Sequence, residues 1–375
     1  MIGLRRTPSA RGGVDLTLLT VTAMLVGIGL IMVYSASSVL AMRLTGDVTY
    51  FIKRQILWAA FGFLGMGLLS QVSPARLRSW VVPALVACLA LMVAVALLPL
   101  GKTGSGARRW FALGPVAFQP AELLKVVLVL YLADMLVRKR EHLRHFVPGV
   151  LPPLVVAAAA ASLLLIQPDF GTAAILALVT LGMLFAAGAR LSHLIGLVLT
   201  TLPGLVLLIM KVGYRRRRWD AYLDPWQDAL GKGFQMVQSY LALGSGGLWG
   251  KGLGDSQQKL LYLPAPHTDF IFSILGEELG FAGGLVVIGL FGVFLATGFS
   301  IARRCRDEFS KLAAYGLTLL VGVQTVLNLG VATGLVPTKG TPLPFISAGG
   351  SSLLCTLAAV GILLALSRRV AEEAG

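Results

Sequence analysis

Ionisable side chains inside long apolar stretches are the residues of this chain best suited to do chemistry. Glu122 and Lys125 lie three positions apart within an apolar run at about 117–137, so on a helix they share a face and can form an ion pair. A charged group at membrane depth is costly and usually marks a functional site. The spacing predicts either a functional pair or a self-neutralising pair that only fixes helix packing.

Two aspartates stand directly before apolar runs, where Asp is also favoured as a helix cap. Asp169 lies in Gln167-Pro-Asp-Phe-Gly-Thr172, and Asp269 precedes Phe270-Ile-Phe-Ser-Ile-Leu275. An Asp side chain at such a place accepts hydrogen bonds from the first free backbone amides of the helix. We expect Asp169 to act as a cap, whereas for Asp269 capping and a catalytic role both stay open.

Two adjacent acids, Glu277 and Glu278, interrupt a later apolar run. Carboxylates in such a helix require a polar interior, a partner cation or raised pKa values. Because neighbouring residues on a helix point about 100° apart, these two are not expected to form one paired-carboxylate site.

A run of four arginines precedes the aromatic segment Tyr222-Leu-Asp-Pro-Trp226. It either anchors the chain to anionic headgroups or recognises phosphate through guanidinium forks. Further cations in other predicted outer loops extend the second interpretation to a lipid that carries a pyrophosphate. The cations concerned are Arg215, Arg216, Arg217 and Arg218 in the run, with Arg108, Arg109 and Lys339 elsewhere.

Several other chemistries lack their residues. The histidines are not spaced as zinc ligands, and the cysteines lie far apart and are interpreted as packing residues. Gly250-Lys251 lacks the spacing of a Walker A motif, and Gly-x-Ser-x-Gly is absent. These observations argue against a zinc enzyme, an ATPase and a serine hydrolase. The histidines are His142, His145, His193 and His267, and the cysteines are Cys88, Cys305 and Cys355.

The elements that must position these side chains are membrane spans. Of the 375 residues, 56% are hydrophobic and 13% are charged, whereas soluble domains carry roughly 25% charged residues. The net charge of +15 has no nucleic-acid motif beside it, so it must face headgroups or anionic ligands rather than a nucleic acid. We expect an all-α polytopic membrane protein.

Ten apolar runs predict ten transmembrane helices in a single membrane domain that covers residues 1–375. Each run is about as long as a bilayer span requires. The runs lie at about 14–36, 55–72, 79–100, 117–137, 147–166, 170–189, 191–212, 270–298, 312–336 and 349–367.

Basic residues set the predicted orientation. Short loops on one side hold most of the Lys and Arg once segment 213–269 is set aside, because long loops count little in the positive-inside rule. Both ends, 1–13 and 368–375, are therefore predicted to be cytoplasmic, and 213–269 is predicted to be a large external loop between the seventh and eighth helices. Its aromatic and Gly-rich composition favours short amphipathic helices at the outer interface.

Several long motifs occur in an order that resembles the SEDS family (shape, elongation, division, sporulation) over nearly the whole chain. Within that family, Leu253–Leu260 and Pro337–Gly340 are most similar to the division-associated members, with the shape and sporulation members as alternatives. The motifs are Gly106-Ala-Arg-Arg-Trp110, Gln119-Pro-Ala-Glu-Leu-Leu-Lys125, Gln167-Pro-Asp-Phe-Gly-Thr172, Asp224-Pro-Trp226 with Gln238-Ser239, Leu263-Pro-Ala-Pro-His-Thr-Asp-Phe-Ile-Phe272 with Gly276-Glu-Glu-Leu-Gly280, and Pro342-Leu-Pro-Phe-Ile-Ser-Ala-Gly-Gly-Ser-Ser352.

The resemblance implies a peptidoglycan glycosyltransferase of the bacterial cytoplasmic membrane that polymerises lipid II at the outer face. It implies a class B penicillin-binding protein and other divisome or elongasome membrane proteins as partners, and no nucleic acid. The essential acid falls on Asp269, with Lys125 as its ion partner and Glu122 in support. The residues implied to bind substrate are Trp110, Arg108, Arg109, Gln119, Arg215, Arg216, Arg217, Arg218, His267, Lys339 and Ser351.

The implied reaction is an inverting transfer. An α-linked donor and a β-linked product require one direct displacement, in which Asp269 takes the proton of the acceptor 4-hydroxyl and undecaprenyl pyrophosphate leaves. A divalent cation, Mg or Mn, would help to neutralise that leaving group, and no organic cofactor is expected. The chain departs from the family at Ala348, where a Tyr is usual, so no role is predicted for that side chain.

Two other functions stay open. A lipid II flippase could use Glu122, Lys125, Glu277 and Glu278 to line a path through the membrane, but it needs headgroup-binding cations at both faces. A scaffold without catalysis would leave the cost of placing Asp269 and Lys125 at membrane depth unexplained.

Overall fold

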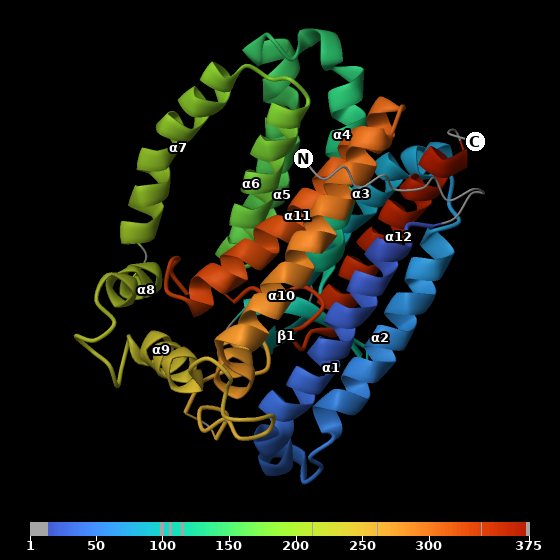
Figure 1. Cartoon of the computed structure of the whole chain (residues 1–375). Coiled ribbons are helices and arrows are strands. Elements are labelled where there is room, and N and C mark those ends of the chain that lie inside the picture. The colour runs from blue at the N-terminus through green and yellow to red at the C-terminus, as the bar shows by residue number, and fades with distance from the viewer. Residues whose placement is uncertain are drawn as a thin grey trace, which may run out of the picture.

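Each predicted apolar run corresponds to a helix (Figure 1). The computed structural model describes residues 14–97, 101–104, 107–113, 116–211, 213–260, 262–338 and 340–372. The helices of the apolar runs are α1 (Leu16–Thr45), α2 (Tyr50–Leu69), α3 (Pro74–Leu97), α4 (Pro120–Arg138), α5 (Leu151–Ile166), α6 (Phe170–Ala186), α7 (Leu191–Lys211), α10 (Ile271–Arg304), α11 (Glu308–Ala332) and α12 (Gly350–Glu372). A 3-10 turn (Arg140–His142) and a π turn (Phe146–Val150) join α4 to α5.

Length and composition identify membrane-crossing helices. Six helical stretches of the described residues are long and apolar enough to span a membrane, namely those in α1, α3, Phe146–Ile166, α10, α11 and α12, and α6 and part of α7 are shorter apolar helices. The chain is therefore a multi-pass membrane protein, while the total of ten spans stays a prediction.

Aspartates begin several of these helices. Asp169 accepts a hydrogen bond from the backbone amide of Thr172 at the start of α6 (3.1 Å), which confirms its predicted capping role. Asp307 does the same for α11 through Ser310 (2.9 Å). Such side chains satisfy amides that have no partner within the helix.

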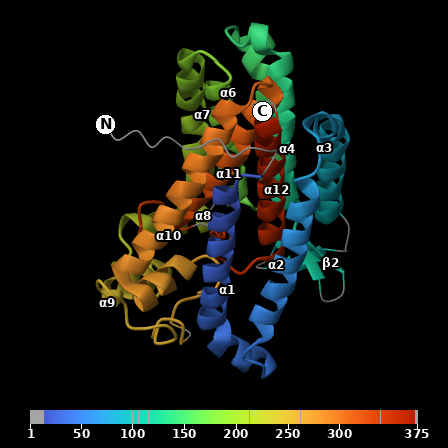
Figure 2. The ribbon, with the colours of Figure 1, turned by 45° about the vertical axis from the view of Figure 1, so that its right-hand side comes forward.

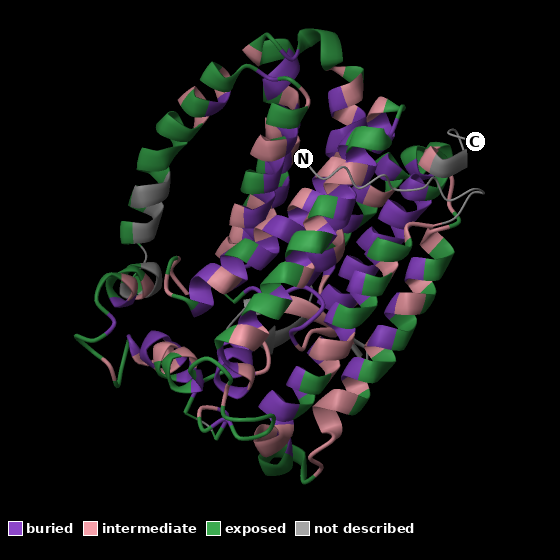
Figure 3. Ribbon diagram, in the orientation of Figure 1, coloured by how far each residue is buried: buried purple, intermediate pink, exposed green. Residues whose placement is uncertain are grey.

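The centre of the bundle is formed by α4, α11 and α12. Helix α11 contacts α4, α6, α9, α10 and α12, while α2 packs on α12, α3 on α4, and α1 on α10 and α2 (Figure 2). Figure 3 shows that α11 and α12 are largely buried, whereas α7 is mostly exposed and stands to one side of the bundle.

The bundle has two ends. The amide of Asp15, before α1, donates to Ser367 Oγ near the end of α12 (3.3 Å), so the start of α1 and the end of α12 share one end, named here the terminal end. At the other end, named the distal end, the amide of Gln119 before α4 donates to Ser351 Oγ at the start of α12 (3.1 Å). Helix α4 connects the two ends over about 28 Å at 1.5 Å per residue.

The fold is all-α as predicted, with one small sheet added at the distal end. Strands β1 (Gly101–Gly104), β2 (Ala107–Leu113) and β3 (Val116–Phe118) form an antiparallel sheet in the order β1-β2-β3, between α3 and α4. Phe111 of β2 pairs with Gly101 on one side and Phe118 on the other. These strands were not predicted because they are only three to seven residues long. Their role is to carry Arg109 and Trp110 to the site.

The predicted external segment contains two short helices, as expected. They are α8 (Gly213–Leu223) and α9 (Phe234–Gly246), followed by irregular chain up to α10. Ser239 of α9 contacts Ser273 Oγ (2.6 Å) and donates to the carbonyl of Ala332 (2.7 Å). These contacts fix α9 against α10 and α11 at the distal end (Figure 1).

Helix α10 is broken at Gly280, which has φ 68° and ψ −170°. The break frees the carbonyls of Glu277 and Glu278, and these accept the amides of Lys251 and Gly252 (3.0 Å each). A Cβ atom at Gly280 would lie 2.3 Å from the backbone nitrogen of Gly250, so this close approach requires glycine. The Gly-rich run after α9 is therefore docked into the broken helix.

Candidate active site

Asp269 lies just before α10 without capping it. The cap position of α10 is Phe270, which makes no side-chain cap bond, and in the described ranges no donor forms a hydrogen bond with the Asp269 carboxylate. The backbone of Asp269 is fixed instead, because Asn328 Nδ2 of α11 donates to its carbonyl (3.1 Å) and to that of Thr341 (2.8 Å). The capping alternative for Asp269 is therefore wrong.

The environment of Asp269 changes its acidity. Burial raises the pKa of its carboxyl from 3.8 to about 6, and the Arg218 guanidinium opposes that rise. Burial disfavours the charged form, while a nearby cation favours it. At neutral pH the group is thus an ionised carboxylate that is a stronger base than an ordinary Asp.

The loop before α12 holds the segment that carries Asp269. Ser347 Oγ donates to the carbonyl of Thr268 (2.6 Å), and the amide of Ala348 donates to the carbonyl of His267 (2.8 Å). Gln55 of α2 fixes the same loop by donating to the carbonyl of Ser347 (3.2 Å). Ala348 therefore contributes to this contact through its backbone amide.

A cavity of about 90 Å³ lies beside Asp269 at the distal end. Gly340 connects the two, because it lines the cavity and a Cβ atom built on it would be 3.5 Å from Asp269 Oδ2. The volume is that of about three waters, so only a small group of a larger ligand could enter it. The cavity is lined by Arg109, Trp110, Gln119, Glu122, Lys125, Asp169, Thr172, Ile175, Gln324, Gly340, Thr341 and Pro342.

Glu122 and Lys125 form the ion pair that their spacing predicts. Lys125 Nζ lies 2.9 Å from Glu122 Oε2, and both side chains are buried. The expected ion pair between Lys125 and Asp269 is not formed in this structure. Lys125 neutralises the acid one turn away on α4, because an unpaired carboxylate buried there would be costly.

Asp169 and Arg109 build another wall of the same cavity. Asp169 accepts from Thr172 Oγ1 (2.9 Å) and from Gln119 Nε2 (3.5 Å), so it serves the site as well as capping α6. Arg109 Nε donates to the carbonyl of Gln167 (2.7 Å). Sequence reasoning missed Asp169 as a cavity residue, because only folding brings its motif against Gln119.

The remaining predicted residues separate into three groups. Arg218 lies near Asp269 and its Nη1 donates to the carbonyl of Thr338 (3.1 Å), whereas Arg216 is exposed on α8. Ser351 Oγ donates to the carbonyl of Ala117 (3.3 Å) and joins β3 to α12. Lys339 and the side chains of Arg108, Arg215 and Arg217 lie outside the described residues.

His267 presents a neutral ring beside the site. Its ring packs on Phe51 with the centroids 4.9 Å apart, and burial lowers the pKa of its imidazole to about 4. Nδ1 is buried and has no hydrogen-bond partner among the described residues. His267 therefore offers an uncharged polar contact and not a cation.

Glu277 and Glu278 have separate cation partners, as their helical spacing predicts. Lys251 Nζ lies 2.8 Å from Glu277 Oε1, and Lys259 Nζ lies 3.0 Å from Glu278 Oε1. Ser35 of α1 also donates to Glu278 (2.6 Å). Each acid is neutralised by a lysine of the loop docked into the break.

Comparison with known proteins gives matches over nearly the whole chain. A family model named FTSW_RODA_SPOVE and described as a cell cycle protein matches residues 16–372. A relative from Geobacter sp. (strain M18), named probable peptidoglycan glycosyltransferase FtsW, is 42% identical over 358 residues, which cover 96% of this chain and 98% of the relative. Stage V sporulation protein E of Bacillus subtilis (strain 168) is 43% identical over 354 residues, which cover 94% and 97%.

A solved structure has the same fold. It is described as the structural coordination of polymerization and crosslinking by a peptidoglycan synthase complex. One of its chains superposes with a TM-score of 0.79 at 32% identity, covering 95% of this chain and 98% of that one.

Proposed function

The chain belongs to the SEDS family, the cell cycle proteins of the FtsW, RodA and SpoVE model, and from that premise we propose that it is a peptidoglycan glycosyltransferase that polymerises lipid II, in cell division. Support comes from the relatives named FtsW and from the match to a peptidoglycan synthase complex. The observation that carries the proposal is the Asp269 carboxylate, which has no hydrogen-bond partner among the described residues and lies beside a polar cavity at the distal end.

Asp269 is the general base of the proposed reaction. It accepts the proton of the acceptor 4-hydroxyl as that oxygen bonds to the anomeric carbon of the donor, and the bond to undecaprenyl pyrophosphate breaks in the same step. A base in this position contributes about 10²–10⁴-fold. The pKa of about 6 supports the role, because the group is ionised at neutral pH yet more basic than an ordinary Asp.

Cations of the distal end balance the leaving pyrophosphate. The position of Arg218 supports this role, because Arg218 is close enough to Asp269 to oppose the rise of the Asp269 pKa. Arg216 lies on the same helix. Guanidinium groups suit phosphate because their donors match its oxygens. We keep Arg108, Arg215, Arg217 and Lys339 as further candidates.

The residues around Asp269 do not make a metal site of their own. Within the described ranges, no three His, Cys, Asp or Glu residues gather as possible metal ligands. No step of the proposed reaction therefore passes through a metal, and the predicted action of Mg or Mn remains to be measured.

The proposed setting is the bacterial cytoplasmic membrane. The distal end faces outward, both termini are cytoplasmic, and a class B penicillin-binding protein is the partner that cross-links the strands. Outside segment 213–269, the short connections at the terminal end carry more basic residues than those at the distal end, and this excess supports the orientation through the positive-inside rule. Those at the terminal end include Arg138, Lys139, Arg140, Arg144, Arg303, Arg304 and Arg306, whereas those with described side chains at the distal end are Arg43, Lys53, Arg54 and Arg109.

The test is strand synthesis from labelled lipid II by the purified protein with its partner penicillin-binding protein. We expect Asp269→Asn to reduce glycan formation at least about 100-fold. Asp255→Asn is the matched control, because Asp255 is an exposed acid of the same external segment. Equal activity of Asp269→Asn and wild type would overturn the proposal.

A flippase is the second candidate, because arginines also line a cavity at the terminal end. This function requires that lipid II move across the vesicle membrane without glycan synthesis. Vesicles of wild type that scramble labelled lipid II and make no strands would favour this function.

A further inference from the structure

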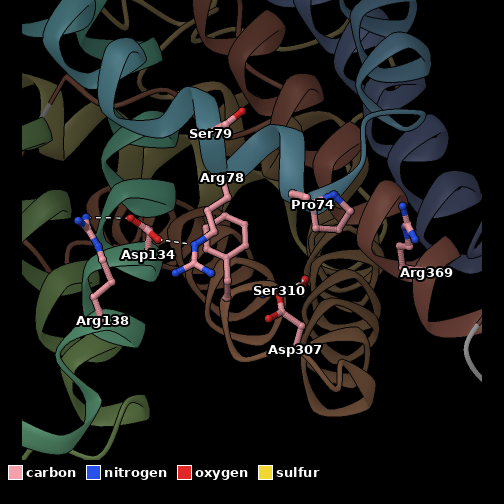
Figure 4. Close-up of a pocket in the computed structure, with 10 residues that line it drawn as sticks. Pro74, Arg78, Ser79, Asp134, Arg138, Asp307, Ser310 and Arg369 are labelled. Carbon is pink, nitrogen blue, oxygen red and sulfur yellow. Dashed lines mark hydrogen bonds and ion pairs between the residues drawn. The ribbon is translucent and has the colours of Figure 1, made fainter.

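A wide cavity at the terminal end plays no part in the proposed reaction. Its volume is about 680 Å³, and it lies between the starts of α3 and α11 and the ends of α4 and α12 (Figure 4). Along α4, its lining residue Asp134 lies about 14 Å from Lys125, which lines the cavity beside Asp269. It is lined by Pro74, Ala75, Arg78, Ser79, Asp134, Arg138, Asp307, Phe309, Ser310 and Arg369.

One wall of this cavity contains two guanidinium groups and one carboxylate. Arg78 Nε lies 2.6 Å from Asp134 Oδ1, and Arg138 Nη2 lies 2.8 Å from Asp134 Oδ2. Asp134 is nearly buried, whereas the two arginine side chains are about half exposed. Since one carboxylate balances only one of the two cations, this wall carries a surplus positive charge with donors open to the cavity.

The opposite wall adds a third guanidinium group. Arg369, on the last turns of α12, lies across the cavity from Arg78 (Figure 4). The second acid of the lining, Asp307, accepts from the amide (2.9 Å) and the Oγ (2.8 Å) of Ser310 as the cap of α11. Both acids are engaged within the protein, so the lining presents a net positive charge to a ligand.

Apolar groups complete the cavity. Pro74 and Ala75 form part of its lining, and Arg78 lies over the ring of Phe309, with Cζ 5.8 Å from the ring centroid. A soluble anion would use only the arginines. A lipid uses both kinds of surface, because its phosphate meets guanidinium groups while its glycerol and first chain carbons meet apolar ones.

We propose that this cavity binds the phosphate headgroup of an anionic phospholipid from the membrane leaflet at the terminal end. The position of the cavity favours a membrane lipid over a soluble anion as the ligand. The cavity lies where the long apolar helix α11 begins and the long apolar helix α12 ends. The ligand class is a phosphodiester with a negative charge, and phosphatidylglycerol is the simplest probe of that class.

The experiment titrates the purified full chain with phosphatidylglycerol, or with phosphatidylcholine, and counts bound lipid by native mass spectrometry. We expect wild type to retain phosphatidylglycerol in preference to phosphatidylcholine, and Arg138→Gln and Arg369→Gln each to weaken its retention at least about fivefold. Arg303→Gln is the matched control, because Arg303 is an exposed arginine at the same end that does not line the cavity.

A conservative variant and a competition with a soluble phosphate test the proposal further. Replacement of Arg369 leaves the ion pairs of Asp134 in place. Arg369→Lys keeps the positive charge and should keep most of the binding, and an unchanged unfolding midpoint in Arg369→Gln separates lost binding from a folding defect. Soluble glycerol 3-phosphate at equal concentration should not displace the lipid. Displacement by it, equal retention of both lipids, or unchanged retention in Arg138→Gln and Arg369→Gln would each overturn the proposal.

Discussion

Two acidic regions, one just before α10 and one at its break, lie less than three helical turns apart and differ in how their charges are balanced. At the break, Glu277 and Glu278 are completely buried and each is paired with a lysine. At the start, the Asp269 carboxylate accepts no hydrogen bond from the described residues and lies beside a cavity. An acid at membrane depth is therefore informative about chemistry only once its partners are known.

The difference has opposite energetic consequences. Removing one member of a buried ion pair leaves the other charge without compensation, which is strongly destabilising. Removing the charge of Asp269 instead relieves a desolvation cost that the nearby Arg218 offsets only in part. The break is thus expected to govern stability, and the start of α10 is expected to govern activity.

The largest expected effect on stability is that of Glu278→Gln. It leaves the Lys259 ammonium, whose side chain is 7% exposed, without its carboxylate, and we expect a loss of about 3 kcal/mol. Thermal unfolding in detergent measures it. Lys259→Met combined with Glu278→Gln should recover much of the loss, and an unchanged midpoint in Glu278→Gln would show that the break does not depend on the pair.

A smaller loss is expected for Lys251→Gln. The Lys251 side chain is 29% exposed, so water replaces part of its interaction with Glu277. Glu277 also keeps its hydrogen bond from Ser256 Oγ (2.5 Å) and one from the amide of Gln257 (3.1 Å). We expect about 1 kcal/mol in the same unfolding measurement. A loss as large as that of Glu278→Gln would contradict the ranking by burial.

Asp269→Asn should change stability in the opposite direction and by the smallest net amount, because burial of the Asn amide, which is also polar, cancels much of the relief. The folded pKa of about 6 lies above the usual 3.8, so the unfolded chain releases the proton more readily and the carboxylate destabilises the fold increasingly from about pH 4 to pH 6. Above pH 6 the full cost is present, and Asn removes it. We expect the unfolding midpoint at pH 7.5 to rise by a few degrees and to be unchanged near pH 4. A fall at pH 7.5 would mean that Asp269 is a stabilising group.

Local spacing predicted several of these features. The pairing of Glu122 with Lys125 follows from their positions on one helix, and the cap at Asp169 from its place before an apolar run. The apolar runs themselves located the long helices, because bilayer thickness sets their length.

Features that depend on distant segments could not be predicted. The partners of Glu277 and Glu278 are 26 and 19 residues away, and their register depends on how the Gly-rich loop docks at Gly280. Arg78 and Asp134 are 56 residues apart. The choice between capping and catalysis at Asp269 depends on the backbone of Phe270, which has φ −113° and ψ 23°, and no sequence pattern specifies it.

The most direct test of the claim that Asp269 is the base is the pH–rate profile of glycan synthesis. The carboxylate must be ionised to accept a proton, so we predict that kcat/KM falls tenfold per pH unit below an apparent pKa of about 6 and is flat above it. Asp269→Glu should keep an acidic limb, shifted toward the pKa of its own carboxyl, and the residual rate of Asp269→Asn should lack it. A profile that stays flat from pH 5 to pH 7.5, or an acidic limb unchanged in Asp269→Asn, would contradict the assignment.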